Sequence, residues 1–351
     1  MSVAEEVRAI RHSVGLSRLD QVRYIAVTGA RAFEALDQVV SGPLRVRDGQ
    51  LMHSLLLTDD AHPLADVYVA RDDEDFFLLA EGPTSGALVE HLRRYFPTDG
   101  SVQVEDRTAT HGIVGLDGPY AWELLGATVD PEVIGLPYLT FYHHGGLLCY
   151  RAGKTGEYGY GVIVPRGDID VLETRLRTVG AMFDLHAAGL DALDQCALEN
   201  WFFNIRREGR ERVTPIELQL QWRVSYKKQF VGSEALRRRR SDGPRVRITC
   251  LLADGPIEVG DAVAAVGATV GRVVNAGYSD IREEWVALAL LELPWAYPGI
   301  DSLTIPSGSA TPVMVRTVSP PVLQNRSLAV SPQLHSYATR AEYPAPPLVR
   351  R

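Results

Sequence analysis

The sequence predicts an α+β protein that ends in a small β-barrel or sandwich. Two observations predict this class: helical segments alternate with strand pairs in the first two thirds, and short strands then dominate from 245 to 318. A chain of 351 residues can form two or three domains with ample core. The hydrophobic content of 46% and the charged content of 23% are ordinary for globular proteins, which excludes wholesale disorder, collagen and coiled coil.

The first unit of this pattern combines two helices with three strands. Residues 28–40 begin with Thr-Gly and carry apolar side chains at helical spacing, and residues 85–96 form an amphipathic helix with a serine cap. Between these helices, two strands flank the acidic turn 71–75, which predicts a β-hairpin. The predicted strands cover residues 51–57, 65–70 and 76–80.

A second unit contains the same kinds of element. Gly118 and Pro119 open one of its helices, because proline is favoured in the first helical turn. The recurrence suggests two related halves. The predicted strands of this unit cover residues 111–116, 146–151 and 158–164, and its helices cover residues 118–125 and 168–179.

The C-terminal third has a different texture. Glycine, proline and aspartate punctuate its short strands, which is typical of a small barrel or sandwich. A turn-rich boundary, Ser-Asp-Gly-Pro, lies at 241–244, and the proline-rich end has no periodicity. We therefore expect an α+β region of two subdomains at 1–242, a barrel-like domain at 243–330 and an extended tail at 331–351, either loose or laid over the body.

The charge is distributed unevenly. The net charge is −8, but residues 206–247 contain 13 basic and 5 acidic side chains, so the remainder of the chain carries −16. An acidic protein with one basic segment is a poor general nucleic-acid binder, so no nucleic-acid partner is expected. The segment either holds an anionic ligand or is a solvated surface.

The cysteines and the termini indicate the compartment. Cys149, Cys196 and Cys250 lie in apolar surroundings without metal-ligand spacing, and three thiols cannot form a complete set of disulfides. We expect buried free thiols in a reducing compartment. No run of about 20 apolar residues and no N-terminal signal segment is present, so we expect a cytoplasmic protein without membrane contact.

The common nucleotide, protease and hydrolase motifs are absent. The chain has no GxGxxG, no Walker loop, no HExxH and no useful GxSxG. Rossmann dehydrogenases, P-loop NTPases, zincins and α/β-hydrolases therefore lack support, and no metal site is expected.

Two carboxylates stand out as candidate site residues. Asp66 interrupts an apolar strand, and a carboxylate there is costly to bury unless it is paired or used. Glu157 lies in a glycine-rich loop, where close backbone approach would let it accept hydrogen bonds from a flat heterocycle. A strand-edge aspartate facing water and a plain hairpin loop are the alternatives.

Two further positions are weaker candidates. His53 lies in a strand and could face Asp66 across a sheet, although a lone histidine is more often structural. Glu199 stands beside Trp201 and two phenylalanines, as in a pocket wall or a helix end packed on the core.

In these segments the sequence resembles the folate-binding aminomethyltransferase family, which comprises the T-protein of the glycine cleavage system, tetrahydrofolate-dependent demethylases and related proteins. The resemblance covers about residues 14–318, and it rests on the order and spacing of several short pieces rather than on any single one. These pieces are Ala65–Val69, Gly118–Ala121, Arg151 with Thr155–Tyr160, Gly189–Asp194 with Leu198 and Glu199, Thr214–Glu217, Phe230–Leu236, Gly271–Val273 and Gly277–Ser279.

The resemblance implies a three-domain ring around a central folate cavity, with tetrahydrofolate as the cofactor. It implies that Asp66 is the catalytic residue near the reactive N5 nitrogen and that Glu157 grips the pterin, which suits a carboxylate in a dry cavity. The remaining site residues are expected around them. Tyr158, Glu199, Trp201 and Tyr68 are expected on the cofactor side, and His53 and Glu81 on the substrate side.

Several positions depart from the family pattern. Ala197 replaces an arginine, Glu81 and Gly82 replace an asparagine–alanine pair, and His53 replaces a tyrosine found in many members. These changes disfavour glycine cleavage itself, and the lack of a cysteine in 226–232 disfavours the branch of iron–sulfur maturation factors.

The expected function is tetrahydrofolate-dependent transfer of a one-carbon unit from a small N-, O- or S-methylated compound. Two alternatives remain open: an enzyme of the same fold that has lost folate dependence, and a non-catalytic folate-binding protein. If the protein uses tetrahydrofolate, the basic segment 206–247 is expected to form a rim at the mouth of the cavity that attracts the carboxylates of the folate glutamyl tail.

Overall fold

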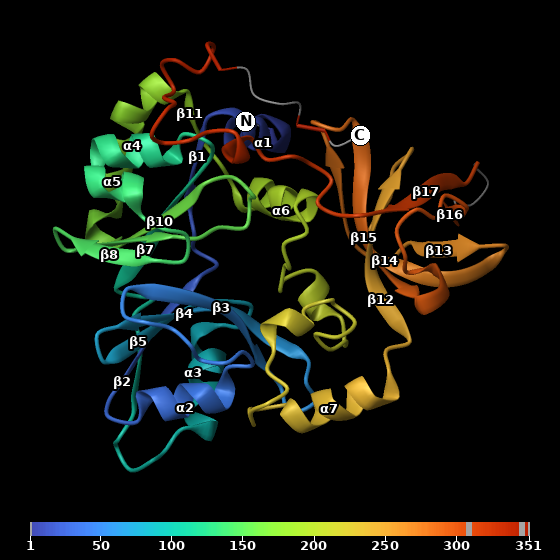
Figure 1. Cartoon of the computed structure of the whole chain (residues 1–351), viewed down its shortest axis with the longest axis horizontal. Coiled ribbons are helices and arrows are strands. Elements are labelled where there is room, and N and C mark those ends of the chain that lie inside the picture. The colour runs from blue at the N-terminus through green and yellow to red at the C-terminus, as the bar shows by residue number, and fades with distance from the viewer. Residues whose placement is uncertain (1, 307–310, 344–347, 350–351) are drawn as a thin grey trace.

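The computed structural model describes residues 2–306, 311–343 and 348–349. Three lobes surround a central segment that contains α6 (Figure 1). Two lobes are sheets covered by helices, and the third is a closed barrel, which confirms the predicted α+β class. In the described residues, short 3-10 turns occur at Pro131–Gly135, Arg166–Asp168, Ala181–Phe183, Glu208–Arg210, Gln221–Arg223, Leu293–Trp295 and Arg326–Leu328.

The first lobe is a five-stranded sheet in the order β3-β4-β5-β2-β6, covered by two helices. The predicted hairpin is confirmed, since Asp72 of β4 pairs with Asp75 of β5. The predicted helix at 28–40 begins only at Ala32, because Thr28 ends a strand and Gly29 has a φ of +113°. Thr84, not a serine, caps the second helix. The elements are β2 Arg23–Thr28, α2 Ala32–Val39, β3 Gln50–Leu57, β4 Pro63–Asp72, β5 Asp75–Glu81, α3 Ser85–Tyr95 and β6 Gln103–Asp106.

The second lobe is a six-stranded sheet in the order β11-β1-β7-β10-β9-β8. Its neighbours are antiparallel except for β1 and β11, because β11 returns beside β1 after a helical crossover. Its strands are β1 Val14–Arg18, β7 His111–Asp117, β8 Phe141–His144, β9 Leu147–Arg151, β10 Gly159–Pro165 and β11 Leu185–Ala187, and its helices are α1 Val3–His12, α4 Ala121–Thr128, α5 Ile169–Gly180 and α6 Leu190–Glu199.

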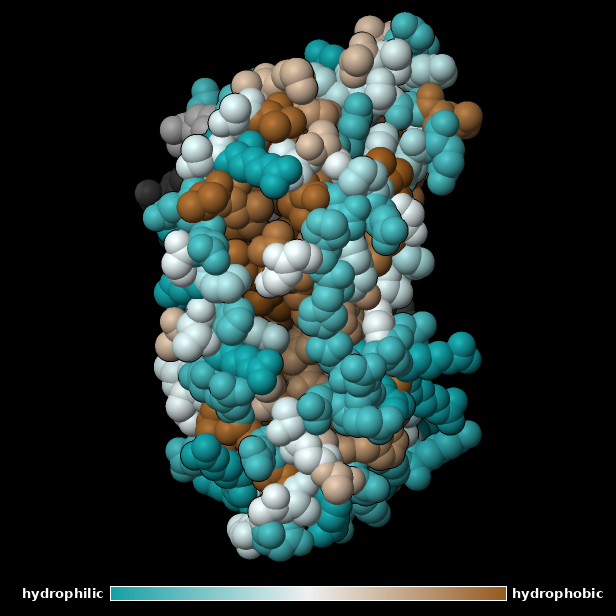
Figure 2. Space-filling view, turned by 90° about the vertical axis from the view of Figure 1, so that its left-hand side faces the viewer, coloured by the Kyte–Doolittle hydropathy of each residue, from teal (hydrophilic) through white to brown (hydrophobic). Residues whose placement is uncertain are grey.

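The two sheets share one apolar core where they meet. Leu51 and Phe77 from the first sheet pack with Phe141, Tyr150 and Ile163 from the second. Burial of this shared core fixes the two sheets against each other, because apolar area removed from water stabilises by roughly 25 cal/mol per Å². Hydrophobic side chains also gather in the middle of the face formed by the two sheet lobes, with hydrophilic ones around them (Figure 2).

The third lobe is a closed barrel in the order β12-β15-β14-β13-β16-β17, which decides between the predicted barrel and sandwich. Helix α7 (Ser233–Asp242), which contains four consecutive arginines, leads into it. The strands are β12 Val246–Ala253, β13 Ala262–Ala265, β14 Ala268–Ser279, β15 Glu284–Glu292, β16 Leu303–Ile305 and β17 Val313–Val318.

The C-terminal segment lies on the second lobe around Val330 and Tyr337, whereas Val349 packs with the apolar cluster between the central segment and the barrel. Val330 and Tyr337 pack against the core of that lobe, and the Tyr337 N–H donates to Glu123 Oε2 at 2.7 Å. Cys149, Cys196 and Cys250 are buried and free, as predicted. In the described ranges, none of the helices has the length and apolar character needed to span a membrane.

Candidate active site

A pocket lies between the two sheets and α6, beside their shared core. Its empty volume is about 790 Å³, a figure that includes space open to solvent. Polar and aromatic side chains line it, and they come from β3, β4, β5, β7, β9, β10, α6, the loop after β9 and the segment after α6. They include His53, Asp66, Tyr68, Glu81, Asp117, Tyr150, Lys154, Thr155, Tyr160, Asp194, Phe203 and Arg206.

Strand register brings four predicted site residues together. Asp66 and Tyr68 are two positions apart on β4, so both side chains point to the same face. On neighbouring strands, His53 pairs with Tyr68 and Glu81 pairs with Asp66. The His53 and Tyr68 rings stack with centroids 4.4 Å apart. The sequence prediction that His53 lies near Asp66 is therefore supported by the geometry.

The cross-strand pair of Asp66 and Glu81 needs a cation, because like charges directly opposite each other destabilise a sheet. Lys154, from the loop between β9 and β10, supplies it from the other sheet. Its Nζ lies 2.7 Å from Asp66 Oδ2 and 2.9 Å from Glu81 Oε1. Lys154 thus links the two sheets electrostatically across the pocket.

Arginines extend this pairing at both ends. Arg206 contacts Glu81 and also Asp194 of α6. Arg223, itself buried, contacts Asp66 Oδ1 and donates to the carbonyl of Ser54 at 2.7 Å. The result is an alternating chain of three carboxylates and three cations, which makes this wall of the pocket close to neutral.

Asp66 is held as a carboxylate. It is only 2% exposed, and this burial alone would raise its pKa. Arg223, Lys154 and His53 outweigh burial and hold the pKa of Asp66 well below its usual range. Asp66 therefore provides a fixed negative charge at neutral pH, and it is a poor proton acceptor.

His53 is neutral at physiological pH. Burial lowers its pKa to about 4, against the opposing effect of Asp66. His53 Nε2 lies 2.7 Å from Asp66 Oδ1. Since a carboxylate only accepts, we assign the proton of the neutral ring to Nε2, which leaves Nδ1 as an acceptor.

Aromatic side chains form another wall. Tyr150 of β9 lies over Gly161 of β10, where an added Cβ would meet Tyr150 Cζ at 2.1 Å. Glycine at 161 therefore allows the tyrosine ring to lie flat on the sheet. The Tyr68 hydroxyl is buried without a hydrogen-bond partner in the described residues, which leaves it available to a ligand.

The other four predicted site residues lie outside the pocket lining. Glu157 accepts hydrogen bonds from the backbone N–H groups of Arg326 and Ser327 at 3.1 and 2.7 Å, so the C-terminal segment occupies its carboxylate. The Tyr158 hydroxyl donates to the Val330 carbonyl at 2.7 Å. The geometry thus gives no support to pterin binding by either residue.

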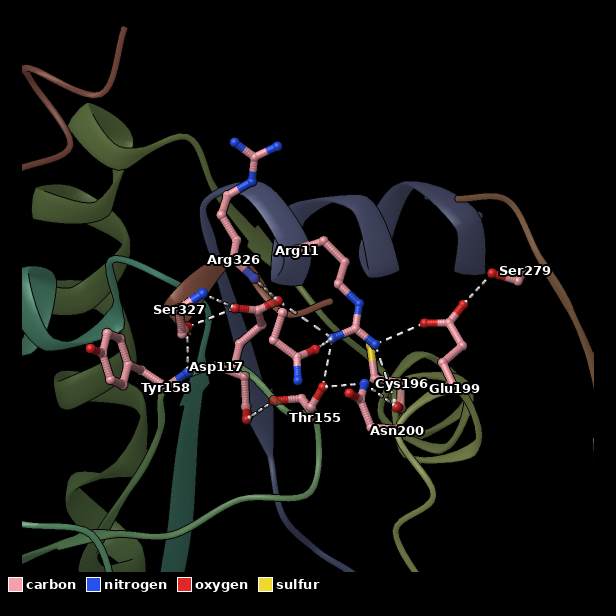
Figure 3. A network of polar contacts seen from close by, with 12 residues as sticks. Arg11, Asp117, Thr155, Tyr158, Cys196, Glu199, Asn200, Ser279, Arg326 and Ser327 are labelled. Atoms are coloured by element: carbon pink, nitrogen blue, oxygen red, sulfur yellow. Dashed lines mark hydrogen bonds and ion pairs between the residues drawn. The ribbon is translucent and has the colours of Figure 1, made fainter. Parts of the chain in front are cut away.

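Glu199 and Trp201 are also placed elsewhere. Glu199 Oε2 lies 2.8 Å from Arg11 Nη2, in an ion pair that is fully buried on both sides, and Ser279 donates to the other oxygen at 2.7 Å (Figure 3). Trp201 packs on the apolar cluster between the central segment and the barrel. The sequence predicted that both residues line a pocket. In the structure they instead connect α1, α6 and the barrel.

Sequence reasoning missed four charged residues of the pocket. Lys154 was visible only as part of the glycine-rich loop, and Arg206 as one of the 13 basic residues. Asp117 directly follows a predicted strand, and Asp194 ends one of the short pieces that carry the resemblance. Of the basic residues in 206–247, Arg206 lines the pocket and Arg223 supports it from behind. The Arg237–Arg240 run lies on α7, outside the lining, so the predicted rim does not include it. No metal-ligand cluster occurs among the residues that the structure describes.

Comparisons with known proteins agree with this architecture. The model of the GCVT N-terminal domain matches residues 1–228. Two similar relatives are aminomethyltransferases from Exiguobacterium sibiricum (28% identical over 304 residues, 84% of this chain and 83% of the relative) and Chlorobaculum parvum (28% over 327 residues, 90% and 89%). The solved structure of glycine cleavage system aminomethyltransferase T from Bartonella henselae superposes with a TM-score of 0.81 at 24% identity, covering 91% of this chain and 89% of the other, which shows a shared fold.

Proposed function

This chain belongs to the GCVT N-terminal domain family, and from that premise we propose that it transfers a one-carbon unit between tetrahydrofolate and a small N-, O- or S-methylated compound. It is an enzyme of the aminomethyltransferase type. The observation that carries the proposal is the pocket between the sheets, where a permanently ionised Asp66 lies among aromatic side chains.

The pocket has features that suit a flat, donor-rich heterocycle such as a pterin. Tyr150, Tyr160 and Phe203 offer faces for stacking. Among the described residues, the Tyr68 hydroxyl has no hydrogen-bond partner, and Asp117 offers an acceptor oxygen that no side chain uses. A ligand that satisfies these groups gains affinity, because buried polar groups otherwise remain without hydrogen bonds.

The reaction itself needs charge stabilisation and a dry site. A carbon leaves a heteroatom X, forms a bond to a nitrogen of tetrahydrofolate, and a proton passes from that nitrogen to X. Positive charge develops on the nitrogen as the bond forms. Asp66 can oppose that charge without reorganisation, because His53, Lys154 and Arg223 already hold its carboxylate in place.

The decisive assay measures 5-methyltetrahydrofolate formed from a panel of N-, O- and S-methylated donors. We expect turnover with at least one donor, and a loss of about 100-fold in kcat for Asp66→Asn. The exposed Asp168→Asn serves as the matched control, since Asp168 lies outside the pocket and has no ion pair in the described residues. Full activity of Asp66→Asn would remove Asp66 from the mechanism.

One observation favours a second candidate, an enzyme of this fold that no longer uses folate. Arg223 and His53 contact Asp66 Oδ1 and Lys154 contacts Oδ2, so a folate amine must share a carboxylate that the chain already pairs. Calorimetric titration separates the candidates: saturable binding of tetrahydrofolate supports the first, and turnover of a methylated compound without it supports the second.

We further propose that the enzyme acts in the cytoplasm. Its three cysteines are buried and free, which suits a reducing compartment. The proposed partners are small molecules rather than nucleic acid.

A further inference from the structure

Asp117 differs from the other carboxylates of the pocket. It is the last residue of β7, is 7% exposed, and lines the pocket. Its Oδ1 accepts a hydrogen bond from Thr155 Oγ1 at 2.8 Å. In the part of the chain that the structure describes, its Oδ2 has no hydrogen-bond partner, and no cationic side chain forms an ion pair with it.

The backbone around Asp117 leaves room for its carboxyl group and little else. Ideal Cβ atoms added to Gly153 and Gly159 would lie 3.1 and 3.0 Å from Asp117 Oδ1. The two glycines therefore form a narrow seat that side chains at those positions would fill. A carboxyl group seated this way, buried and without a cation, is a costly arrangement unless a ligand uses it.

We propose that Asp117 is the proton-exchanging residue of this pocket, taking up the proton that the reaction releases and returning it to the departing heteroatom. The proposal rests on the proposed function. As the new C–N bond forms, the attacking nitrogen loses its proton to the Asp117 carboxylate. As the C–X bond breaks, the same proton passes to X, so the carboxylate is restored and the charges balance.

The two aspartates thus divide the work. Two cations, Arg223 and Lys154, hold Asp66 ionised, so it stabilises charge. Asp117 has no such partners, and burial raises its pKa to about 7, with the Thr155 hydrogen bond and Arg11 opposing that rise. A group that is half protonated near neutral pH both accepts and donates efficiently.

Titratable groups on four other segments interact electrostatically with Asp117. Arg11 comes from α1, Tyr150 from β9, Glu157 from the loop after β9, and Cys196 from α6. Burial raises the pKa values of the Tyr150 phenol and the Cys196 thiol, so both are neutral near pH 7. The positive charge of Arg11 lowers the pKa of Asp117 and the negative charge of Glu157 raises it, while burial has the largest effect.

The first experiment needs no ligand and no activity. In ¹³C NMR of the full chain labelled at aspartate carboxyl carbons, we expect one resonance with a midpoint near pH 7, absent from Asp117→Asn and present in the exposed control Asp168→Asn. Thr155→Val removes a hydrogen bond that favours the ionised form, so its midpoint should rise by at least half a unit, while Thr155→Ser should leave it in place. Absence of any aspartate that titrates between pH 6 and 8 would overturn the proposal.

The second experiment measures turnover of tetrahydrofolate with an accepted donor as a function of pH. Wild-type kcat should depend on a group near pH 7, and Asp117→Asn should lose this dependence and about 100-fold in kcat with a KM changed less than threefold. A merely structural role would change KM or stability and leave the pH profile intact. If the NMR titration is observed but tetrahydrofolate is not turned over, the proposed function is wrong and the ionisation of Asp117 stands. If turnover is observed and Asp117→Asn keeps the wild-type pH profile, the proton-transfer role is wrong and the proposed function stands.

Discussion

Replacing Lys154 with methionine removes one positive charge from between two carboxylates and keeps a side chain of similar length. Its Nζ lies 2.7 Å from Asp66 Oδ2 and 2.9 Å from Glu81 Oε1, so the two oxygens are at most 5.6 Å apart, the sum of the two distances. At an effective dielectric constant of about 20, two unit charges at that separation repel by about 3 kcal/mol. We expect Lys154→Met to lower the free energy of unfolding by about that amount at pH 7.

The loss should shrink as the pH falls. In the wild type, burial raises the pKa of Glu81, but Lys154 and Arg206 outweigh burial and lower it. In the variant the neighbouring Asp66 charge raises the folded-state pKa of Glu81 above its unfolded value. A group with a raised folded pKa stabilises below its unfolded pKa, and that stabilisation disappears as the pH rises through the folded pKa. About 3 kcal/mol corresponds to roughly two pKa units, so the deficit should be clearly smaller at pH 5 than at pH 7.

Urea unfolding followed by tryptophan fluorescence at pH 5 and pH 7 measures both effects. Lys227→Met is the matched control, because Lys227 is exposed and its side chain has no ion pair in the described residues. Adding Glu81→Gln to Lys154→Met should recover most of the lost stability, since one of the two repelling charges is then absent. A deficit below about 1 kcal/mol at pH 7, or an equal deficit at both pH values, would refute the assignment of Lys154 as the bridge.

Three further predictions concern the framework around the pocket. Arg11→Met breaks a fully buried ion pair with Glu199 and should lower the free energy of unfolding in urea by about 3–5 kcal/mol. The affinity for tetrahydrofolate should stay within twofold of the wild type, and unchanged stability would contradict the prediction. Gly161→Ala places a Cβ where the Tyr150 ring lies and should cost about 1–3 kcal/mol, seen as a lower melting temperature, and an unaltered melting temperature would show that the ring moves freely. His53, whose pKa burial lowers to about 4, should show no titration of its imidazole signals between pH 6 and 8 by NMR, whereas a midpoint near 6.5 would contradict its burial beside Asp66.

Local patterns predicted most of the fold. The hairpin of β4 and β5 was visible because apolar strands flank an acidic turn, and the barrel because glycine and proline punctuate short strands. The start of α2 was placed four residues early, because Thr28 and Gly29 resemble a helix start, while tertiary pairing draws Thr28 into β2. Closure of the barrel depends on contacts between β12 and β17, which no local pattern reveals.

The candidate site was only half accessible from the sequence. Asp66, Tyr68, His53 and Glu81 lie on three strands that are neighbours in both the chain and the sheet. Their shared face could therefore be predicted from local patterns. Lys154 reaches them from another sheet, so its role depends on how the two sheets pack.

The same limit applies to two carboxylates outside the pocket. Glu157 looked like a ligand-binding carboxylate because it lies in a glycine-rich loop, and Glu199 because it stands beside aromatic residues. Their partners include residues far away along the chain, Ser327 at a separation of 170 residues for Glu157 and Arg11 at a separation of 188 residues for Glu199.

The most direct test of the central claim is calorimetric titration of the full chain with tetrahydrofolate, comparing the wild type with Tyr68→Phe. The Tyr68 hydroxyl is buried without a partner in the described residues, so its removal should leave stability unchanged and report only on a ligand. We expect one saturable site per chain, with affinity weakened about fivefold or more in Tyr68→Phe. Absence of binding, or equal affinity in the two proteins, would contradict the claim that folate binds between the two sheets.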